Sequence, residues 1–193
     1  MKKTLLLASV ATIASLQAHA WEFKPYIGVD YVYSIADIDK DEVLNKTVFE
    51  KKYNNIALDF GLKLHQNFGL EAFAQFSDKG EKSNSFAGIN FKTEINYRAF
   101  GLDAIGYLPL SNQFDLLGSV GFAYYDFDEK LTIPAVNYSE KESDDHWALR
   151  AGIGAQYSIN ENFAIRGMLH YNRIDMDGLD HIIDLSAGIR YYF

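Results

Sequence analysis

The chain ends with IIDLSAGIRYYF, residues 182–193, and the polarity of these residues alternates at almost every position. The apolar members of the stretch are Leu185, Ala187, Ile189, Tyr191 and Phe193, and the residues between them are Asp184, Ser186, Gly188, Arg190 and Tyr192. Successive side chains of an extended strand point to opposite faces, so the stretch predicts a strand with one apolar and one polar face. An apolar face opposite a face that carries Asp184 and Arg190 is typical of a strand with lipid on one side and polar surroundings on the other.

Alternation of this kind recurs along the chain and divides it into eight segments. The segments cover residues 23–34, 53–64, 68–76, 93–108, 114–125, 146–157, 163–172 and 182–193. A tilted strand needs roughly 9 to 11 residues to cross a bilayer, and most of the segments are close to this length. We therefore predict an all-β fold, an eight-stranded antiparallel transmembrane up-and-down β-barrel.

The fourth segment is the least regular of the eight. Its apolar residues Phe100, Leu102 and Leu108 share a face with Glu94 and Arg98. Either the charged residues stand above the hydrocarbon, or a bulge changes the parity of the strand. The sequence leaves both interpretations open.

The connections between the segments alternate in length. Short connections at 65–67, 109–113 and 158–162 alternate with long ones at 35–52, 77–92 and 126–145, and the connection at 173–181 is intermediate. Short turns at one end and long loops at the other are typical of an outer-membrane barrel. Phe68, Phe114 and Phe163 each follow a short turn, which predicts that they lie at one depth as an aromatic girdle.

The N-terminus has the features of an export signal. Lys2 and Lys3 precede an apolar run at 5–16, and Ala18-His19-Ala20 supplies a small-residue cleavage site. The run is shorter than the roughly 20 apolar residues of a membrane-spanning helix. We expect a cleaved signal peptide over residues 1–20, with Ala18 and Ala20 at the cleavage site, and one barrel domain over residues 21–193.

The composition excludes several functional classes. The formal net charge is −8, and the first 20 residues hold two of the lysines and none of the acids, so no nucleic-acid partner is expected. Cysteine is absent, which excludes disulfides, thiol nucleophiles and thiolate metal sites. Aromatic residues form 15% of the chain and prolines number three, a composition that favours strands.

A soluble sandwich or a lipocalin-like barrel also has about eight alternating strands, but its apolar faces point into a core. Aromatic residues at the strand ends, the terminal Phe193 and glycines on the polar face favour the membrane barrel instead. Small residues on the polar face suit a narrow interior, whereas a face in water does not need them. These glycines are Gly28, Gly61, Gly121, Gly152, Gly154 and Gly188.

With the Ala18-His19-Ala20 site, the hairpin periodicity and the ending Ile189-Arg190-Tyr191-Tyr192-Phe193, the chain resembles the small eight-stranded outer-membrane barrels of Gram-negative bacteria. This porin-like group includes the opacity proteins and the N-terminal barrel of the OmpA type. The resemblance implies location in the cell outer membrane and contact with its lipid and lipopolysaccharide. It also implies that Ile189, Tyr191 and Phe193 form the signal read by the barrel-assembly machinery. With no segment after Phe193, an OmpA-type peptidoglycan anchor is not expected.

The predicted inward face carries many charges. An eight-stranded barrel is only wide enough for its own side chains to fill it, and unpaired charge inside it would be costly. We therefore predict a filled interior with a balanced charge network; the alternative is a narrow ion conduit gated by rearranged pairs among Arg150, Arg166 and Glu71. The predicted network comprises Asp30, Asp59, Lys63, Glu71, Asp103, Arg150, Arg166, Asp184 and Arg190, with Lys24 and Asp115 on the same face.

The stretch from Arg166 to Asn172 is somewhat similar to the lipid A deacylase barrels, which present a His-x-Ser pair on a late strand. Here the pair is His170 and Asn172, and asparagine cannot supply the activated hydroxyl that a histidine base requires. His170 is also predicted to face inward, away from lipid. We expect no enzymatic activity and no catalytic residue.

The long connections carry much of the negative charge, since residues 126–145 hold seven acids and two lysines. Residues 37–42 and 175–180 superficially resemble calcium loops, but neither has the EF-hand order of glycine and glutamate. No metal or cofactor is expected, although weak divalent bridging to lipopolysaccharide stays open. The sequence favours a structural or surface-interaction role, adhesin-like or antigen-like, with a possible host or surface ligand. The alternatives are a low-conductance channel and, third, a lipid-modifying enzyme.

Overall fold

The computed structural model describes residues 23–38, 52–78, 80–86, 89–133, 138–176 and 179–193, and these residues form antiparallel β-strands with tight turns at 66–67, 110–113 and 159–162. No helix among them is long and apolar enough to cross a membrane. The strands are β1 Lys24–Ile38, β2 Lys52–His65, β3 Phe68–Ser77, β4 Gly80–Phe86, β5 Ile89–Pro109, β6 Phe114–Ile133, β7 Tyr138–Ser158, β8 Phe163–Met176 and β9 Leu179–Tyr192.

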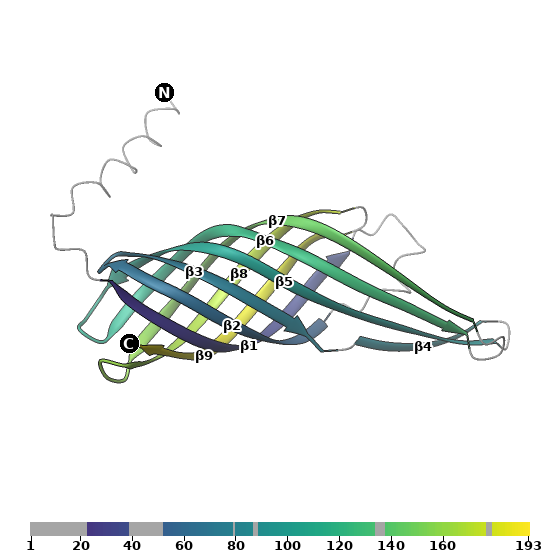
Figure 1. Ribbon diagram of the computed structural model, residues 1–193, viewed down its shortest axis with the longest axis horizontal. Coiled ribbons are helices and arrows are strands. Elements are labelled where there is room, and N and C mark those ends of the chain that lie inside the picture. Colours follow the sequence, from purple (N-terminus) through teal and green to yellow (C-terminus); the bar gives the residue numbers. More distant parts are fainter. Residues whose placement is uncertain (1–22, 39–51, 79, 87–88, 134–137, 177–178) are drawn as a thin grey trace, which may run out of the picture.

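The strands close into a barrel (Figure 1). β1 pairs with both β2 and β9, and β3 pairs with β5 to complete the circle. β3 and β4 follow one another along the same edge of β5, so the nine strands form a barrel with eight strand positions. The prediction of a closed eight-stranded antiparallel barrel is therefore confirmed. Closure satisfies the backbone hydrogen bonds of the wall, which a lipid environment demands.

Side chains alternate between the two faces of the wall as predicted. In β2, Ile56, Leu58 and Phe60 are 58%, 41% and 63% exposed, whereas Ala57 and Asp59 between them are buried. In the closing strand β9, Leu185 and Ile189 are likewise exposed, whereas Asp184 and Arg190 are buried. The outside of the barrel is therefore an apolar band and the inside is polar.

Aromatic side chains line both ends of the apolar band. Phe68, Phe114 and Phe163 are the first residues of β3, β6 and β8, so each follows a short turn at the same end of the barrel. At the opposite end, the outward Trp147 ring lies 5.9 Å from Phe122 and 5.3 Å from Tyr124. Two such rings of aromatic side chains are typical of a barrel with a membrane–water interface at each end.

Strands β6 and β7 extend well beyond the alternating segments 114–125 and 146–157. The β6–β7 pairing runs without a shift from Phe114 opposite Tyr157 to Ile133 opposite Tyr138. The expected long loop at 126–145 is therefore wrong, because most of it is paired strand, and the expected loop at 77–92 contains β4 and the start of β5. Both faces of a strand outside the membrane meet water, so the hairpin continues there without the apolar alternation that reveals it in the sequence.

The irregular fourth segment contains no bulge. Its pairing with β6 is continuous from Lys92 opposite Thr132 to Pro109 opposite Asp115, so the bulge interpretation is wrong. The side chain of Arg98 is 47% exposed on the outward face, where its guanidinium lies 2.7 Å from the Asp126 carboxylate and 3.5 Å from that of Asp128. This ion cluster lies beyond the aromatic residues of the same end, which fits charged groups standing above the hydrocarbon.

Candidate functional site

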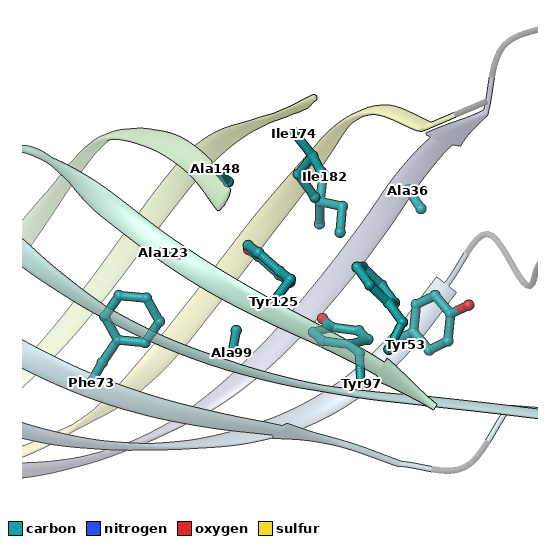
Figure 2. Close-up of a cluster of buried hydrophobic side chains, with 11 residues drawn as sticks. Ala36, Tyr53, Phe73, Tyr97, Ala99, Ala123, Tyr125, Ala148, Ile174 and Ile182 are labelled. Carbon is teal, nitrogen blue, oxygen red and sulfur yellow. The ribbon is translucent and has the colours of Figure 1, made fainter. Parts of the chain in front are cut away.

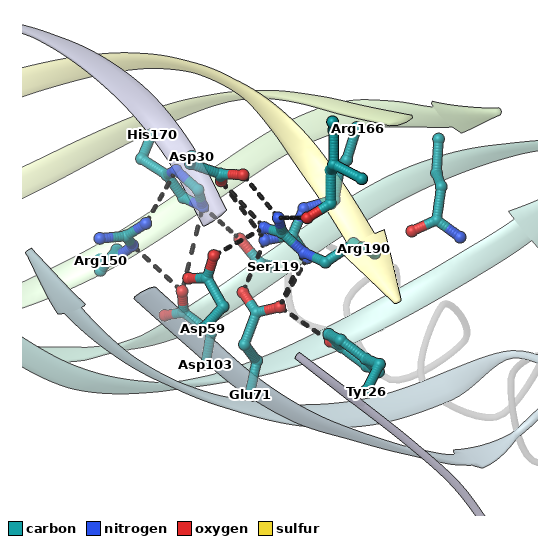
Figure 3. Close-up of polar contacts among 12 residues, drawn as sticks. Tyr26, Asp30, Asp59, Glu71, Asp103, Ser119, Arg150, Arg166, His170 and Arg190 are labelled. Atoms are coloured by element: carbon teal, nitrogen blue, oxygen red, sulfur yellow. Dashed lines mark hydrogen bonds and ion pairs between the residues drawn. The ribbon is translucent and has the colours of Figure 1, made fainter. Parts of the chain in front are cut away.

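The middle of the barrel interior holds a cluster of two arginines and three carboxylates (Figure 3). Arg190 donates hydrogen bonds to both carboxylate oxygens of Asp30, and its Nη2 lies 3.0 Å from Asp59. Arg166 makes two parallel hydrogen bonds of 2.7 Å to Glu71. Both arginines and all three carboxylates are almost completely buried. Bidentate pairs of this kind are the strongest charge-assisted hydrogen bonds. The Arg166–Glu71 pair locks β8 to β3 across the barrel, and the Arg190–Asp30 pair joins the adjacent strands β9 and β1.

A second group lies next to this central cluster. Arg150 Nε is 3.1 Å from the Asp103 carboxylate, and Arg150 Nη2 is 3.0 Å from His170 Nδ1. The other ring nitrogen of His170, Nε2, lies 3.2 Å from the Ser119 hydroxyl. Arginine can only donate, so Nδ1 accepts and the neutral ring carries its proton on Nε2. His170 therefore donates to Ser119 in this arrangement.

The third group surrounds Asp184, which is fully buried. The Ser34 hydroxyl donates to one Asp184 oxygen at 2.5 Å, and the Asn172 amide donates to the other at 2.8 Å. Ser34 in turn accepts from the Asn55 amide at 2.7 Å and from the Tyr97 hydroxyl at 2.8 Å. Side chains from five strands thus meet around one carboxylate.

Near the short turns, Lys63 closes the interior. Its Nζ lies 3.7 Å from the Asp115 carboxylate and 4.3 Å from the centroid of the Tyr107 ring. Lys24, which was predicted to face inward, is exposed instead because it is the first residue of β1 and stands at the rim. The structure therefore divides the predicted network into a central cluster, the Arg150 and Asp184 groups, and a separate Lys63 pair.

Aromatic and aliphatic side chains fill the interior on both sides of these charges. Figure 2 shows the cluster towards the long hairpins, in which the rings of Tyr97 and Tyr125 lie 5.7 Å apart and Tyr53 packs against Tyr97 at 5.3 Å. At the other end, the rings of Tyr26 and Tyr192 lie 4.9 Å apart. Side chains thus occupy the polar middle and both ends of the described interior.

Two inward glycines leave the space that the buried side chains need. A Cβ at Gly61 would come within 1.9 Å of the Tyr26 ring, and a Cβ at Gly28 would come within 2.5 Å of Arg190 Nη1. Tyr26 in its present position donates to Glu71 at 2.8 Å. The glycines of the polar face thus let the central cluster form.

Sequence reasoning missed the neutral partners of the charged residues. Ser119 was not connected with His170, because the two residues lie on β6 and β8 and only the barrel brings them together. Ser34, Asn55 and Tyr97 were likewise missed as partners of the Asp184 group. The alternation along the predicted strands indicates that these side chains point into the barrel. It does not indicate how far along the barrel axis each side chain lies.

Some predicted features lie outside the described residues. These are the signal peptide with Ala18 and Ala20, residues 39–42 of the first calcium-like stretch and residues 177–178 of the second. Within the part of the chain that the structure describes, no group of three or more histidine, cysteine or acidic side chains is placed to hold a metal ion. Ile189, Tyr191 and Phe193, which the family resemblance predicts as an assembly signal, are all outward and exposed at the end of the chain.

Beyond the long-hairpin end of the wall, four strands continue as an open sheet (Figure 1). This surface sheet comprises β4 with residues 89–95 of β5, 127–133 of β6 and 138–146 of β7. β8 joins β7 only from Ala148 onward, and β4 pairs with β5 alone. Within the described residues, the surface sheet therefore ends in two strands that each have one unpaired side.

A family model for the outer membrane protein beta-barrel domain matches residues 4–193 of the chain. The chain belongs to this family. Members of this outer-membrane family insert with short turns in the periplasm and long connections outside the cell. The protein is accordingly an outer-membrane protein. From the usual topology of such barrels we expect the short-turn end to face the periplasm and the surface sheet to lie outside the cell.

Solved structures of other outer-membrane barrels share the fold of this family member. OprG from Pseudomonas aeruginosa has a TM-score of 0.64 at 18% identity, over 90% of this chain and 97% of OprG. Ail, the attachment invasion locus protein of Yersinia pestis, has a TM-score of 0.61 at 16% identity, over 89% of this chain and 99% of Ail. Neisserial surface protein A has a TM-score of 0.58 at 15% identity, over 89% and 97% of the two chains. Curated proteins give no match.

Proposed function

We propose that the protein is a surface-interaction protein, in which the filled barrel anchors the surface sheet outside the outer membrane. The observation that carries this proposal is the pair of open edges on β4 and β7. An open edge presents backbone N–H and C=O groups that another extended polypeptide can pair with. The proposed binding mode is therefore the addition of a partner strand to the extracellular sheet.

Charge selects between the possible partners of the β7 edge. Residues 138–146 contain Glu140, Glu142, Asp144 and Asp145 but one lysine, Lys141. Ail has been solved with the heparin analogue sucrose octasulfate, a polyanion. The acidic edge of the present chain disfavours such a ligand, because like charges repel across an interface. We propose a basic extended segment of a polypeptide as the partner.

Shortening the hairpin tests this proposal. Asp126 and Asp145 are directly opposite in the β6–β7 pairing, so an Asn-Gly turn can replace residues 127–144 without a change of register. The protein in lipid nanodiscs is passed over immobilised ten-residue peptides in which threonine and valine alternate with lysine, serine or glutamate. We expect the wild type to retain the lysine peptide best, and the shortened variant to lose at least about tenfold in affinity for it. The acidic β7 edge is absent from this variant, and the side of β5 that the deletion unpairs, residues 92–97, has no net charge to attract lysine.

A charge-neutral variant provides the matched control. Glu140→Gln with Glu142→Gln keeps the edge, so it should keep binding to the serine peptide and lose the preference for lysine. Heat-modifiable migration on a gel checks that each barrel is folded. Undiminished lysine-peptide binding by a folded, shortened variant would refute the proposed role of the sheet.

We propose further that the protein is not a lipid-modifying enzyme, although the fold brings a histidine and a serine together. His170 directs its protonated Nε2 at Ser119 and therefore cannot take the proton of that hydroxyl, which a serine nucleophile requires. Both residues are also buried inside the barrel, away from the lipid face. Mass analysis of lipid A from cells with and without the protein should give identical profiles, and a lost acyl chain would contradict this proposal.

A further inference from the structure

Asp184 differs from the other buried carboxylates of the barrel. It is 0% exposed, and no described arginine, lysine or histidine side chain forms an ion pair with it. The residue directly opposite Asp184 on the neighbouring strand β8 is His170, but the two ring nitrogens of His170 face Arg150 and Ser119 instead. Leaving a buried carboxylate ionised without a counter-charge costs several kcal/mol, on the order of the penalty for any desolvated ion.

The hydrogen-bond pattern fits an ionised Asp184 that accepts at both carboxylate oxygens. The Asn172 amide nitrogen also donates to the Ile182 carbonyl, which fixes the orientation of the amide, so Asp184 accepts from it. The Asn55 amide is fixed in the same way by the Val32 carbonyl and donates to Ser34. Ser34 also accepts from Tyr97, so its single proton is directed at Asp184.

Three buried oxygen atoms on residues in the Asp184 group or packed against it have no hydrogen-bond partner. They are Asn172 Oδ1, Asn55 Oδ1 and the Tyr125 hydroxyl, on residues that are 0%, 2% and 0% exposed. The two amide groups belong to the Asp184 group through their nitrogens, and the Tyr125 ring packs against Tyr97 of the same group. A buried polar atom without a partner is costly, so these oxygens are available to an additional bound species.

Counting charges gives the sign of that species. In this half of the interior, Arg150 pairs with Asp103 and also acts electrostatically on Asp184, so two carboxylates share one guanidinium. Carboxylate, amide and hydroxyl oxygens are hard ligands of the type that alkali and alkaline-earth cations prefer. One excess negative charge matches one monovalent cation.

We propose that the barrel binds a monovalent alkali cation beside Asp184, with the free oxygens of Asn172, Asn55 and Tyr125 as further ligands. The competing occupant is a water molecule, because Arg150, the cross-strand neighbour of Asn172, also has an unpartnered nitrogen, Nη1. A water molecule would satisfy this donor and the amide oxygen but would leave two carboxylates, Asp103 and Asp184, with one arginine between them. The cation satisfies both the oxygens and the charge.

Thallium(I), an electron-rich substitute for potassium, tests the site in the wild-type protein without any substitution. Crystals grown in a thallium(I) salt should give one anomalous difference peak within ligand distance of Asp184. Asp184→Asn should remove this peak, and the matched control Asp115→Asn, at the periplasmic end, should keep it. A water molecule without anomalous signal at the site, or a peak that survives in Asp184→Asn, would overturn the proposal.

Thermal unfolding gives a second readout in solution. The unfolding midpoint of the wild type should be at least about 3 °C higher in sodium or potassium chloride than in N-methylglucamine chloride of equal ionic strength. Asp184→Asn should lose this difference. An infrared band of a protonated carboxyl group that is present in the wild type and missing in Asp184→Asn would show a neutral Asp184 and also overturn the proposal.

Discussion

Arg190→Met is expected to lower the free energy of unfolding by about 3–5 kcal/mol, the cost of removing one partner from a buried ion network. Arg190 is completely buried and contacts the carboxylates of Asp30, Asp59 and Glu71. Methionine fills a similar space but leaves three carboxylates facing Arg166 alone. Urea unfolding in lipid vesicles, followed by tryptophan fluorescence, measures the change.

Lys52→Met serves as the control for this substitution. It also removes one positive charge, but from an exposed side chain at the start of β2, so it should change the free energy of unfolding by less than about 0.5 kcal/mol. A loss below about 1 kcal/mol in Arg190→Met would mean that the central cluster contributes little to stability. The interpretation of the interior as a locked network would then fail.

Ile153→Arg is expected to destabilise the barrel by about 2–4 kcal/mol in a bilayer, the cost of a cation on the lipid face near the midplane. Ile153 is 67% exposed and lies halfway along the part of β7 that pairs with β8. In a soluble barrel an outward position as exposed as this would tolerate arginine with almost no cost. The same urea titration in vesicles gives the value.

The same substitution outside the membrane provides the comparison. Ser143→Arg lies on the same strand, within the surface sheet, and should leave the unfolding free energy almost unchanged. Equal effects of the two substitutions would contradict the placement of the apolar band in lipid. A loss of unfolding free energy that is large for Ile153→Arg and small for Ser143→Arg would therefore come from the lipid around residue 153, and not from a general intolerance of arginine on β7.

The wall of the barrel could be predicted because one physical rule decides it. Because lipid lies outside the barrel and a narrow polar interior lies inside, apolar and polar residues must alternate along every strand that crosses the membrane. Residues 182–193 follow this alternation at almost every position. Beyond the membrane the rule no longer applies. The extensions of β6 and β7 past Tyr125 and His146 were therefore expected as loops, although they are paired strands.

The interior could be predicted by residue but not by partner. Parity placed Asp30, Glu71 and Arg166 on the inward face, and all three are buried there. Which carboxylate meets which guanidinium depends on the stagger of the strands and on how far each side chain reaches along the barrel axis. Lys24 is an example: the alternation predicts that its side chain points inward, but its position at the end of the strand leaves it exposed at the rim of the barrel.

The most direct test of the central claim, a barrel that holds a sheet outside the cell, is surface labelling of single cysteines. The chain has no cysteine of its own, so Ser143→Cys in the surface sheet and Asn112→Cys in a short turn each give one label site. We predict that a bulky maleimide added to intact cells labels residue 143 and reaches residue 112 only after the outer membrane is opened. Labelling of residue 112 but not of residue 143 on intact cells would contradict the account.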